Sequence, residues 1–339
     1  MNYFPQPVAR VFRGDFVEST HFGSAAVVDS EGRLLYRVGD PYLITFMRSS
    51  AKPFQAISVV ESGAAREFGF TPSEIAVMAG SHSGEPKHIQ AVQSILGKIG
   101  LGLEHLQCGV HPPIGDISVQ EARGETMERT SYHHNCSGKH AGMLAIAVFK
   151  NLSVHDYISP DHPVQRLIKK TVSEICCYPE DKIGTGVDGC SAPNFALPLY
   201  NMALGFARLT APNAVPREKA QAYNTVAMAM REHPDYVGGE GRFDTVLAGT
   251  RGETIISKAG AEALECFSLI DRRMGAAVKI IDGTKRALFP VCVEFLYKLG
   301  ARTRTGVLDE FHRPTIQNWR GLEVGRIEPG FEIGEVDHE

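Results

Sequence analysis

The stretch from residue 47 to residue 54 reads Met-Arg-Ser-Ser-Ala-Lys-Pro-Phe, and apolar residues with helical spacing follow it. Ser49 and Lys52 are three residues apart, so they lie on one face if a helix begins here. A lysine can be the base for a serine only if burial or nearby positive charge lowers its pKa. The stretch therefore predicts a Ser–Lys nucleophile pair at a helix N-terminus or, as the simpler alternative, a helix cap followed by a solvated lysine.

Composition and charge narrow the functional classes. The chain has 339 residues, 43% hydrophobic and 22% charged, which is typical of a globular protein with one large domain or two lobes. A net charge of −4 does not favour nucleic acid or an anionic membrane surface as a partner. The longest apolar run, near residues 141–149, is too short to span a membrane. The N-terminus lacks a signal-peptide pattern, and the seven cysteines favour free thiols, so we expect a cytoplasmic protein.

Strand patterns occupy both ends of the chain. Residues 8–18 alternate apolar and polar around Gly14, which predicts a strand with a bulge or kink. Residues 23–28 and 34–38 flank an Asp-Ser-Glu-Gly turn and predict a β-hairpin. Three short strands are expected near 254–258, 263–270 and 276–281. After Gly300 the chain is polar, and we expect it to be irregular.

Helical patterns dominate the middle of the chain. Apolar spacing predicts helices near 49–62, 86–99, 138–149, 164–176 and 216–232, and a last one from 284 to 299 that contains Pro290. Long loops are expected at 108–116 and 184–194. These patterns predict a mixed α/β (α+β) fold in a single domain of two lobes, residues 1–339. An antiparallel sheet from 1–63 and 245–339 would form one lobe, and the inserted, mainly helical residues 64–244 the other.

Two further segments carry groups for acyl-transfer chemistry. Ser81 lies in Gly80-Ser-His-Ser-Gly-Glu85, where small residues surround polar ones; an ST-turn that caps the next helix is the alternative. Lys258 lies in Ser257-Lys-Ala-Gly-Ala261, at the end of a predicted strand. A solvated lysine is the alternative there, but the small residues would let a ligand approach the backbone. A free strand N–H could supply one oxyanion donor, and the N–H of Ser49 the other.

A third group of motifs contains thiols. Cys136 and His140 are four residues apart in Asn135-Cys-Ser-Gly-Lys-His140, and Cys190 follows in Gly186-Val-Asp-Gly-Cys190. Thiolates with a nitrogen ligand suit zinc. The alternative is two ordinary buried thiols, because the chain lacks the closely spaced ligand pairs of common zinc sites.

These five motifs, taken in their order along the chain, resemble the bacterial L-asparaginases of the Rhizobium etli type, the asparaginase II family. The resemblance implies a serine β-lactamase-like fold. It implies that Ser49 and Lys52 form the nucleophile pair and that Ser81 and Lys258 form a second Ser–Lys pair. It also implies one Zn²⁺ per chain and a homodimer.

The resemblance implies Cys136, Lys139 and Cys190 as zinc ligands, with water as the fourth. Spacing alone favours His140 instead of Lys139, because a lysine ligand must be neutral. We follow the resemblance and assign His140 to the second shell or to the substrate side. The zinc is then expected to order the site, since the serine already supplies a nucleophile.

The resulting hypothesis is an L-asparagine amidohydrolase with a small-molecule substrate and no nucleic-acid or membrane partner. Ser49 would attack the side-chain amide, and the N–H groups of Ser49 and Ala261 would hold the oxyanion. Arg48 would bind the substrate carboxylate, unless it forms a structural ion pair, and Asp188 would bind the ammonium group. The alternatives are another serine acyl-transfer enzyme, such as a glutaminase, and a non-catalytic zinc-dependent amino-acid-binding protein.

Overall fold

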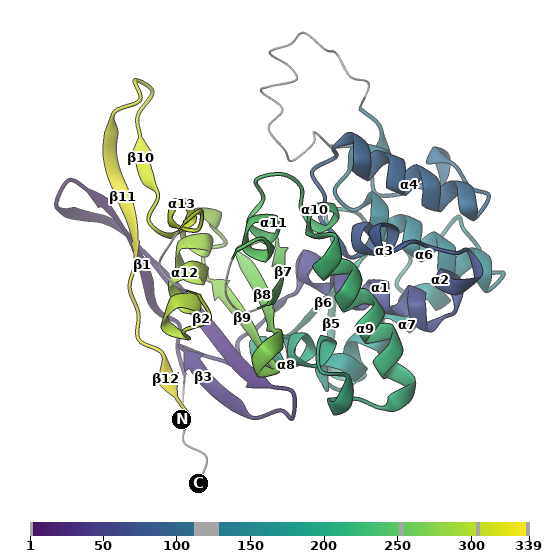
Figure 1. Ribbon diagram of the computed structural model, residues 1–339, viewed down its shortest axis with the longest axis horizontal. Helices are drawn as coiled ribbons and strands as arrows, with labels where there is room; N and C mark the ends of the chain where they lie inside the picture. The colour runs from purple at the N-terminus through teal and green to yellow at the C-terminus, as the bar shows by residue number, and fades with distance from the viewer. Residues whose placement is uncertain (1–2, 112–128, 251–253, 303–305, 337–339) are drawn as a thin grey trace. The chain divides into compact units, whose positions relative to one another are not determined.

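The computed structural model describes residues 3–111, 129–250, 254–302 and 306–336, which fall into two compact units. Unit 1 comprises residues 1–50, 197–214 and 246–339, and unit 2 comprises 51–196 and 215–245. Unit 1 thus draws its strands from both ends of the chain (Figure 1). The sequence placed α1 (Lys52–Glu61) in the sheet lobe and α8 (Leu199–Leu209) in the helical lobe, whereas each groups with the other unit.

An antiparallel sheet forms the centre of unit 1. Its strands lie in the order β10-β11-β1-β2-β9-β8-β7, and β3 joins β2 to β12. The predicted 23–38 hairpin is confirmed as the pairing of β2 with β3, and the three predicted C-terminal strands are β7, β8 and β9. The bounds are β1 Gln6–Arg13, β2 Phe16–Asp29, β3 Leu34–Val38, β7 Ile255–Gly260, β8 Leu264–Leu269, β9 Met274–Ile280, β10 Thr315–Gln317, β11 Glu323–Pro329 and β12 Gly334–Glu335.

The expected kink at Gly14 is instead the turn of a tight hairpin. Gly14 has a φ of +56°, a left-handed conformation that glycine adopts without steric cost. The chain reverses over Gly14 and Asp15, and Arg13 pairs with Phe16. The prediction of one strand over residues 8–18 was therefore wrong, because the alternation of side chains continues on both sides of a two-residue turn.

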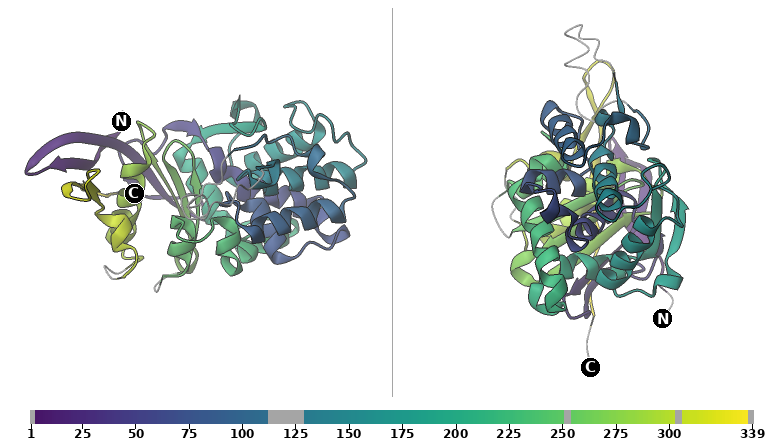
Figure 2. Two further views of the ribbon diagram at one scale, coloured as in Figure 1. Left: turned by 90° about the horizontal axis from the view of Figure 1, so that it is seen from above. Right: turned by 90° about the vertical axis from the view of Figure 1, so that its right-hand side faces the viewer.

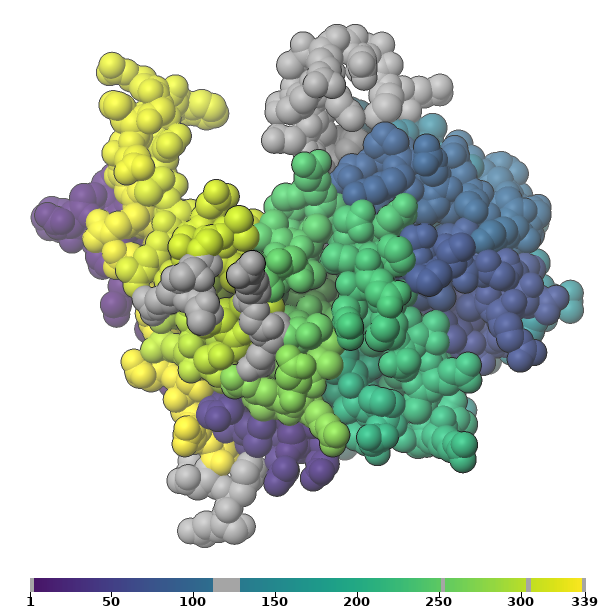
Figure 3. All heavy atoms as spheres, viewed as in Figure 1, coloured from purple at the N-terminus to yellow at the C-terminus, as the bar shows by residue number. Residues whose placement is uncertain are grey.

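The expectation of an irregular tail was also wrong. β11 pairs with β1 from Phe12 and Arg326 to Ala9 and Pro329, and β10 extends the sheet by one more strand. The guanidinium of Arg326 lies 4.5 Å from the centre of the Phe12 ring, which adds a cation–π contact to this pairing. The β10–β11 hairpin stands out from the surface of unit 1 (Figure 3), and Trp319 in its turn is fully exposed.

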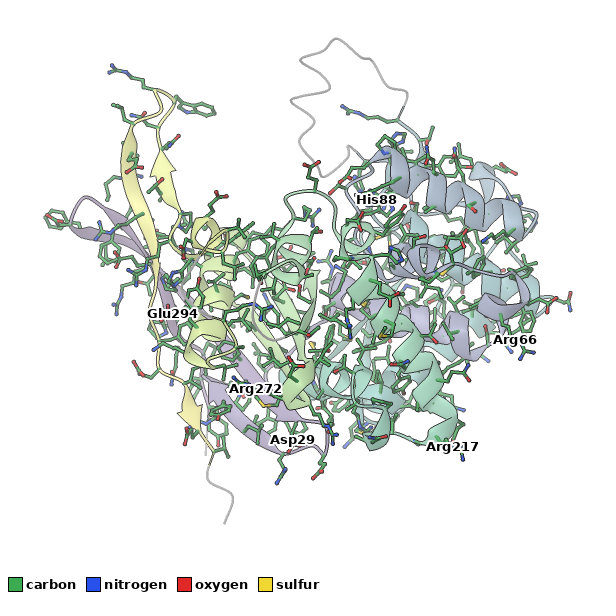
Figure 4. All side chains as sticks on the ribbon, viewed as in Figure 1. Asp29, Arg66, His88, Arg217, Arg272 and Glu294 are labelled. Atoms are coloured by element: carbon green, nitrogen blue, oxygen red, sulfur yellow. The ribbon has the colours of Figure 1, made fainter. Side chains whose placement is uncertain are left out.

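Two long helices cover the sheet. Every residue of β9 is buried, which requires cover on both of its faces, and both α8 and α12 (Lys285–Lys298) contact this strand. A Cβ on Gly275 would collide with the α8 backbone at Ala203, so this close packing depends on glycine. Pro290 lies inside α12, as expected. Arg272, labelled in Figure 4, donates to the Leu299 carbonyl at 2.6 Å, just beyond the end of α12.

Unit 2 is a bundle of helices, which both views of Figure 2 keep together. The predicted helices are confirmed within one or two residues at each end, except that α1 begins at Lys52, three residues after the predicted start at residue 49. α1 contacts α3, α6, α7 and α9, so it is the central helix. A Cβ on Gly138 would collide with the Val77 carbonyl, which sets how closely α6 approaches α3. The bounds are α2 Ala64–Glu67, α3 Pro72–Ala79, α4 Pro86–Lys98, α6 Ser137–Phe149, α7 Pro163–Cys176, α9 Arg217–Glu232 and α10 Pro234–Val237.

The two predicted loops have different outcomes. Residues 184–194 are not a loop throughout, since β5 (Gly184–Val187) pairs with β6 (Pro193–Pro198) as an antiparallel hairpin. Cys190 therefore lies in a tight connection between two strands. The loop predicted at 108–116 lies largely outside the described residues. Across the described ranges, no helix has both the length and the apolar character needed to cross a bilayer.

Candidate active site

Ser49 and Lys52 lie on one continuous helical stretch. Ser49 belongs to the 3₁₀ turn η1 (Arg48–Ala51), and Lys52 is the first residue of α1. Lys52 lies just outside the 3₁₀ turn, and the shared face of the two side chains stays a prediction. Arg48 has a φ of +51°, which is uncommon for a residue with a side chain and marks a constrained turn directly before Ser49.

The Lys52 amine is fully enclosed by polar groups of unit 2. Lys52 is 1% exposed, and its Nζ lies 2.8 Å from the Gly80 carbonyl oxygen, 2.9 Å from the Asn135 carbonyl oxygen and 2.9 Å from Ser81 Oγ. Ser49 is not among these partners. The structure therefore pairs Lys52 with Ser81, the serine of the second predicted Ser–Lys pair.

The chemistry of these three partners orients the amine. A carbonyl oxygen can only accept hydrogen bonds, so both carbonyls take an N–H from Lys52. A neutral amine has two N–H groups and one lone pair. With both N–H groups directed at the carbonyls, the lone pair faces Ser81 Oγ. The neutral amine would therefore accept the Ser81 hydroxyl proton, as a general base does, whereas the ammonium form would donate to all three oxygens.

Burial is the main influence on the charge of Lys52. It lowers the pKa of this amine from its ordinary value of 10.5, while the nearby Cys136 opposes the shift. The positive charge of Lys139 lowers the pKa further, and Cys190 opposes it. The net direction is downward, so the neutral form needed for a base is available at lower pH than in a free lysine.

The Ser81 loop is fixed by its neighbours in unit 2. The Ser81 N–H donates to the Val237 carbonyl at 2.8 Å, and Ser83 Oγ donates to the Gly238 carbonyl at 3.0 Å. The ring of His82 stacks on that of His88, labelled in Figure 4, with centroids 5.0 Å apart. Ser81 is buried, so its hydroxyl is presented to Lys52 by a packed loop and not by a mobile surface turn.

The predicted zinc ligands converge in unit 2. Lys139 Nζ lies 2.9 Å from Cys190 Sγ, and Cys136 hydrogen-bonds to the same sulfur. The Cys136 thiol lowers the pKa of Cys190, with help from Lys139 and His140. Burial disfavours charge on Lys139, but Cys190, Cys136 and Asp188 together raise its pKa. Asp188 Oδ2 is 4.0 Å from Lys139 Nζ.

The donor set fits zinc if Lys139 is the third ligand. No three His, Cys, Asp or Glu side chains in the described ranges could hold a metal ion together, so the two thiols need the lysine amine. Thiolate sulfur and amine nitrogen are both suitable donors for zinc, and a bound Zn²⁺ would displace the ammonium proton. Cys136, Lys139 and Cys190 would hold the ion, which would neutralise the thiolates and fix the positions of α6 and the β5–β6 turn.

Lys258 and Ala261 lie in unit 1, beside the backbone that precedes Ser49. Lys258 is fully buried on β7, and its Nζ donates to the Ala259 carbonyl at 2.7 Å. A Cβ on Gly260 would lie 2.8 Å from the Met47 carbonyl oxygen, so glycine allows β7 to approach this segment closely. The predicted approach at Gly260 is thus made by the chain itself. Ser81 belongs to unit 2, and its pairing with Lys258 stays a prediction.

The two residues expected to bind the charged ends of the substrate also have protein partners. An Arg48 guanidinium nitrogen lies 4.0 Å from Glu262 Oε1, a distance typical of a weak ion pair. Asp188 lies beside Lys139 and Cys190. Sequence analysis did not anticipate the Gly80 and Asn135 carbonyls as partners of Lys52. Both residues stand within the quoted motifs, but a backbone acceptor has no signal in residue type.

Comparisons with known proteins show to which family the chain belongs. The model of the family described as L-asparaginase II matches residues 9–329. None of the curated proteins compared with the chain matches it. Solved structures of similar fold include Mglu, at 11% identity and a TM-score of 0.38, with 84% of this chain and 68% of that chain covered. In a second Mglu crystal structure, determined in 4.3 M NaCl, 62% of that chain is covered.

Two other solved structures are similar at the same level. A β-lactamase from Mycobacterium bovis has 14% identity and a TM-score of 0.38, with 81% of this chain and 94% of that chain covered. A Bacillus glutaminase has 11% identity and a TM-score of 0.37, with 82% and 91% covered. Values this low do not establish a shared activity. The family model, however, extends over most of the sequence and includes all five motifs, so the chain belongs to the L-asparaginase II family.

Proposed function

We propose that the chain hydrolyses the side-chain amide of L-asparagine to L-aspartate and ammonia through an acyl-enzyme on Ser49. Membership of the L-asparaginase II family makes the protein a hydrolase of amides, and the family's name supports asparagine as the substrate. The observation that supports the mechanism is the buried Lys52 amine, which lies within hydrogen-bond distance of two backbone carbonyls and of the Ser81 hydroxyl.

The acylation step uses groups on both sides of Lys52. Ser49 Oγ attacks the amide carbon as its proton passes to Lys52, either directly or through the Ser81 hydroxyl. Ser49 is proposed as the nucleophile because it is half-buried, whereas Ser81 is buried. The C–N bond then breaks, and the proton that Lys52 received passes to the leaving NH₂ group, with Ser81 and Lys258 as the proposed relay, so that ammonia leaves and Lys52 is neutral again. Water attacks the ester, restores the Ser49 hydroxyl and releases aspartate.

Recognition of the substrate uses the remaining predicted residues. The N–H groups of Ser49 and Ala261 are proposed to hold the oxyanion, which the close approach of β7 to the Met47 backbone within unit 1 supports. Arg48 binds the substrate carboxylate in competition with Glu262, and Asp188 binds the ammonium group. Zinc, held by Cys136, Lys139 and Cys190, orders the site and activates no water.

Ammonia release tests the function against its two alternatives. We expect release from L-asparagine to exceed release from L-glutamine when both are assayed side by side, with and without a metal chelator. Faster release from glutamine would make the protein a glutaminase of the same family. Binding of either amino acid without turnover would support the amino-acid-binding alternative and reject hydrolysis.

The pH dependence should follow the protonation of Lys52. A protonated ammonium has no lone pair, so kcat/KM is expected to be low at acid pH, to rise as Lys52 loses its proton and to level off below pH 10.5, because burial lowers this pKa. The measurement is kcat/KM for asparagine across the pH range in which the protein stays folded. Activity that falls as the pH rises from acid to neutral would exclude Lys52 as the base.

Metal content provides a separate prediction. Elemental analysis of the purified protein should find about one zinc per chain, as for a single tetrahedral site. Cys190→Ser removes a thiolate that Lys139 and Cys136 both contact, and this variant should be purified without zinc. Cys177→Ser is the matched control, because Cys177 is exposed and should leave the metal content unchanged. A zinc-free wild-type protein with full activity would reject the zinc site.

The homodimer, the cytoplasmic location and the absence of a nucleic-acid partner stay predictions. Size-exclusion chromatography with light scattering would decide the first. No disulfide joins any two of the described cysteines.

A further inference from the structure

Tyr157 contacts His140, the residue next to the predicted zinc ligand Lys139. Its side chain is fully buried, and its Oη is 2.7 Å from His140 Nδ1 and 2.9 Å from the backbone nitrogen of Gln107. The two rings meet edge to face with centroids 5.6 Å apart. Gln165 donates from its side-chain amide to the Tyr157 carbonyl at 2.7 Å, so the backbone of the tyrosine is fixed as well.

The direction of each hydrogen bond follows from the Gln107 contact. A backbone N–H can only donate, so Tyr157 Oη accepts from Gln107. The hydroxyl still has one hydrogen, and among the described residues its other partner is His140 Nδ1. If Nδ1 carried the proton instead, the hydroxyl hydrogen would be buried without an acceptor, a costly arrangement. Tyr157 therefore donates, and His140 Nδ1 accepts.

This assignment determines whether the other ring nitrogen of His140 carries a proton. A neutral imidazole carries one proton, so with Nδ1 as an acceptor the proton is on Nε2. His140 Nε2 is buried and has no hydrogen bond of normal geometry to any described residue. It faces Cys190, whose sulfur lies 2.9 Å from Lys139 Nζ. An Nε2–H group interacts favourably with a thiolate, but it has no lone pair for a metal ion.

We infer that Tyr157 is a positioning residue that holds His140 as its Nε2–H tautomer, so that His140 supports the Cys190 sulfur and is excluded as a zinc ligand. This inference rests on the proposed zinc site. It answers why an unusual lysine ligand is used although a histidine stands next to it in the sequence. Without the tyrosine hydroxyl, the proton could move to Nδ1, and the freed Nε2 lone pair would compete with Lys139 for the metal.

The tautomer can be measured in the wild-type protein. Long-range proton–nitrogen NMR spectra of protein labelled with ¹⁵N-histidine should show His140 with a protonated Nε2 and an unprotonated Nδ1, assigned by its loss in His140→Gln. X-ray absorption at the zinc edge should show sulfur and nitrogen neighbours without the scattering pattern of an imidazole ring. A proton on Nδ1, an imidazole ligand, or a wild-type protein that binds no zinc would each overturn the inference.

The tyrosine itself is tested by Tyr157→Phe, which removes only the hydroxyl. Zinc affinity, measured by competition with a chromogenic chelator, should fall about 10-fold, the lower end of the effect of residues that orient a metal site, because Tyr157 acts on the Cys190 ligand only through His140. The His140 signal should lose its single tautomer. Tyr178→Phe is the control, since this half-buried hydroxyl makes no hydrogen bond within the described residues. Unchanged affinity and tautomer in Tyr157→Phe would overturn the role of Tyr157.

Two outcomes separate this inference from the proposed function. If Tyr157→Phe does not fold, the wild-type NMR and absorption spectra still decide the tautomer and the ligand. None of these measurements uses asparagine. A protein that shows the expected tautomer and zinc ligands but releases no ammonia would therefore refute the asparaginase proposal and leave the role of Tyr157 intact.

Discussion

Replacement of Lys52 by methionine should lower kcat for asparagine hydrolysis by about 10²- to 10⁴-fold, the usual contribution of a general base. Methionine has a similar length and fills the buried space, but it has neither a lone pair for a serine proton nor N–H groups. The loss should appear in kcat and in kcat/KM equally, because proton transfer is needed only in the transition state.

Stability must be separated from catalysis in this variant. Lys52→Met leaves the Gly80 and Asn135 carbonyls without their donor, at a cost of about 1–3 kcal/mol for each buried acceptor. Circular dichroism at the assay temperature gives the folded fraction, by which the rate is divided. Lys170→Met is the matched control, because the Lys170 side chain is 63% exposed on α7 of the same unit. Near-wild-type kcat in folded Lys52→Met would refute the assignment.

The second large effect is expected from Ser49→Ala. The variant should lose activity by about 10⁴-fold or more, since removal of a nucleophile abolishes the covalent route. Ser49 is half-buried at a turn, so alanine should leave the fold intact. Ser81→Ala should keep a measurable rate, because it removes a proton-transfer group and leaves the nucleophile in place.

Trapping of the acyl-enzyme distinguishes the two serines directly. Acid quenching during turnover, followed by peptide mass spectrometry, should place the aspartyl adduct on the peptide that contains Ser49. The comparison is needed because Lys52 Nζ lies 2.9 Å from Ser81 Oγ, whereas Ser49 is not among the hydrogen-bond partners of this amine. An adduct on Ser81, with activity retained in Ser49→Ala, would reverse the roles of the two residues.

Local patterns sufficed for the helices and for the fold class. α4 begins at Pro86 and carries apolar residues at helical spacing. α9 and α12 also carry apolar residues at this spacing. The mixed α/β fold, with an antiparallel sheet drawn from both ends of the chain, is confirmed. The errors concern strands. The polar residues of β11 become a strand only through β1, more than 300 residues earlier, and no local pattern encodes such a partner.

The candidate site also has a part that local sequence patterns predict and a part that they do not. Side chains that carry the chemistry were found because their residue types are few and their spacing is short. The groups that orient them, such as the Gly80 and Asn135 carbonyls around Lys52, are backbone atoms brought together by packing. The Tyr157 hydroxyl lies 17 residues from His140 in the sequence, with no periodic relation to it. Tertiary contacts of this kind are set by the fold and are invisible in a motif.

The pairing of β1 with β11 also constrains how the protein is made. On the ribosome, β1 emerges more than 300 residues before β11, so one edge of β1 must wait for its partner while all of the segments between them are made. Unit 2 has all of its segments once residue 245 has emerged, so it can become compact earlier. Premature release or a truncated message would therefore leave β1 with an open, aggregation-prone edge, even where the helical unit has already folded.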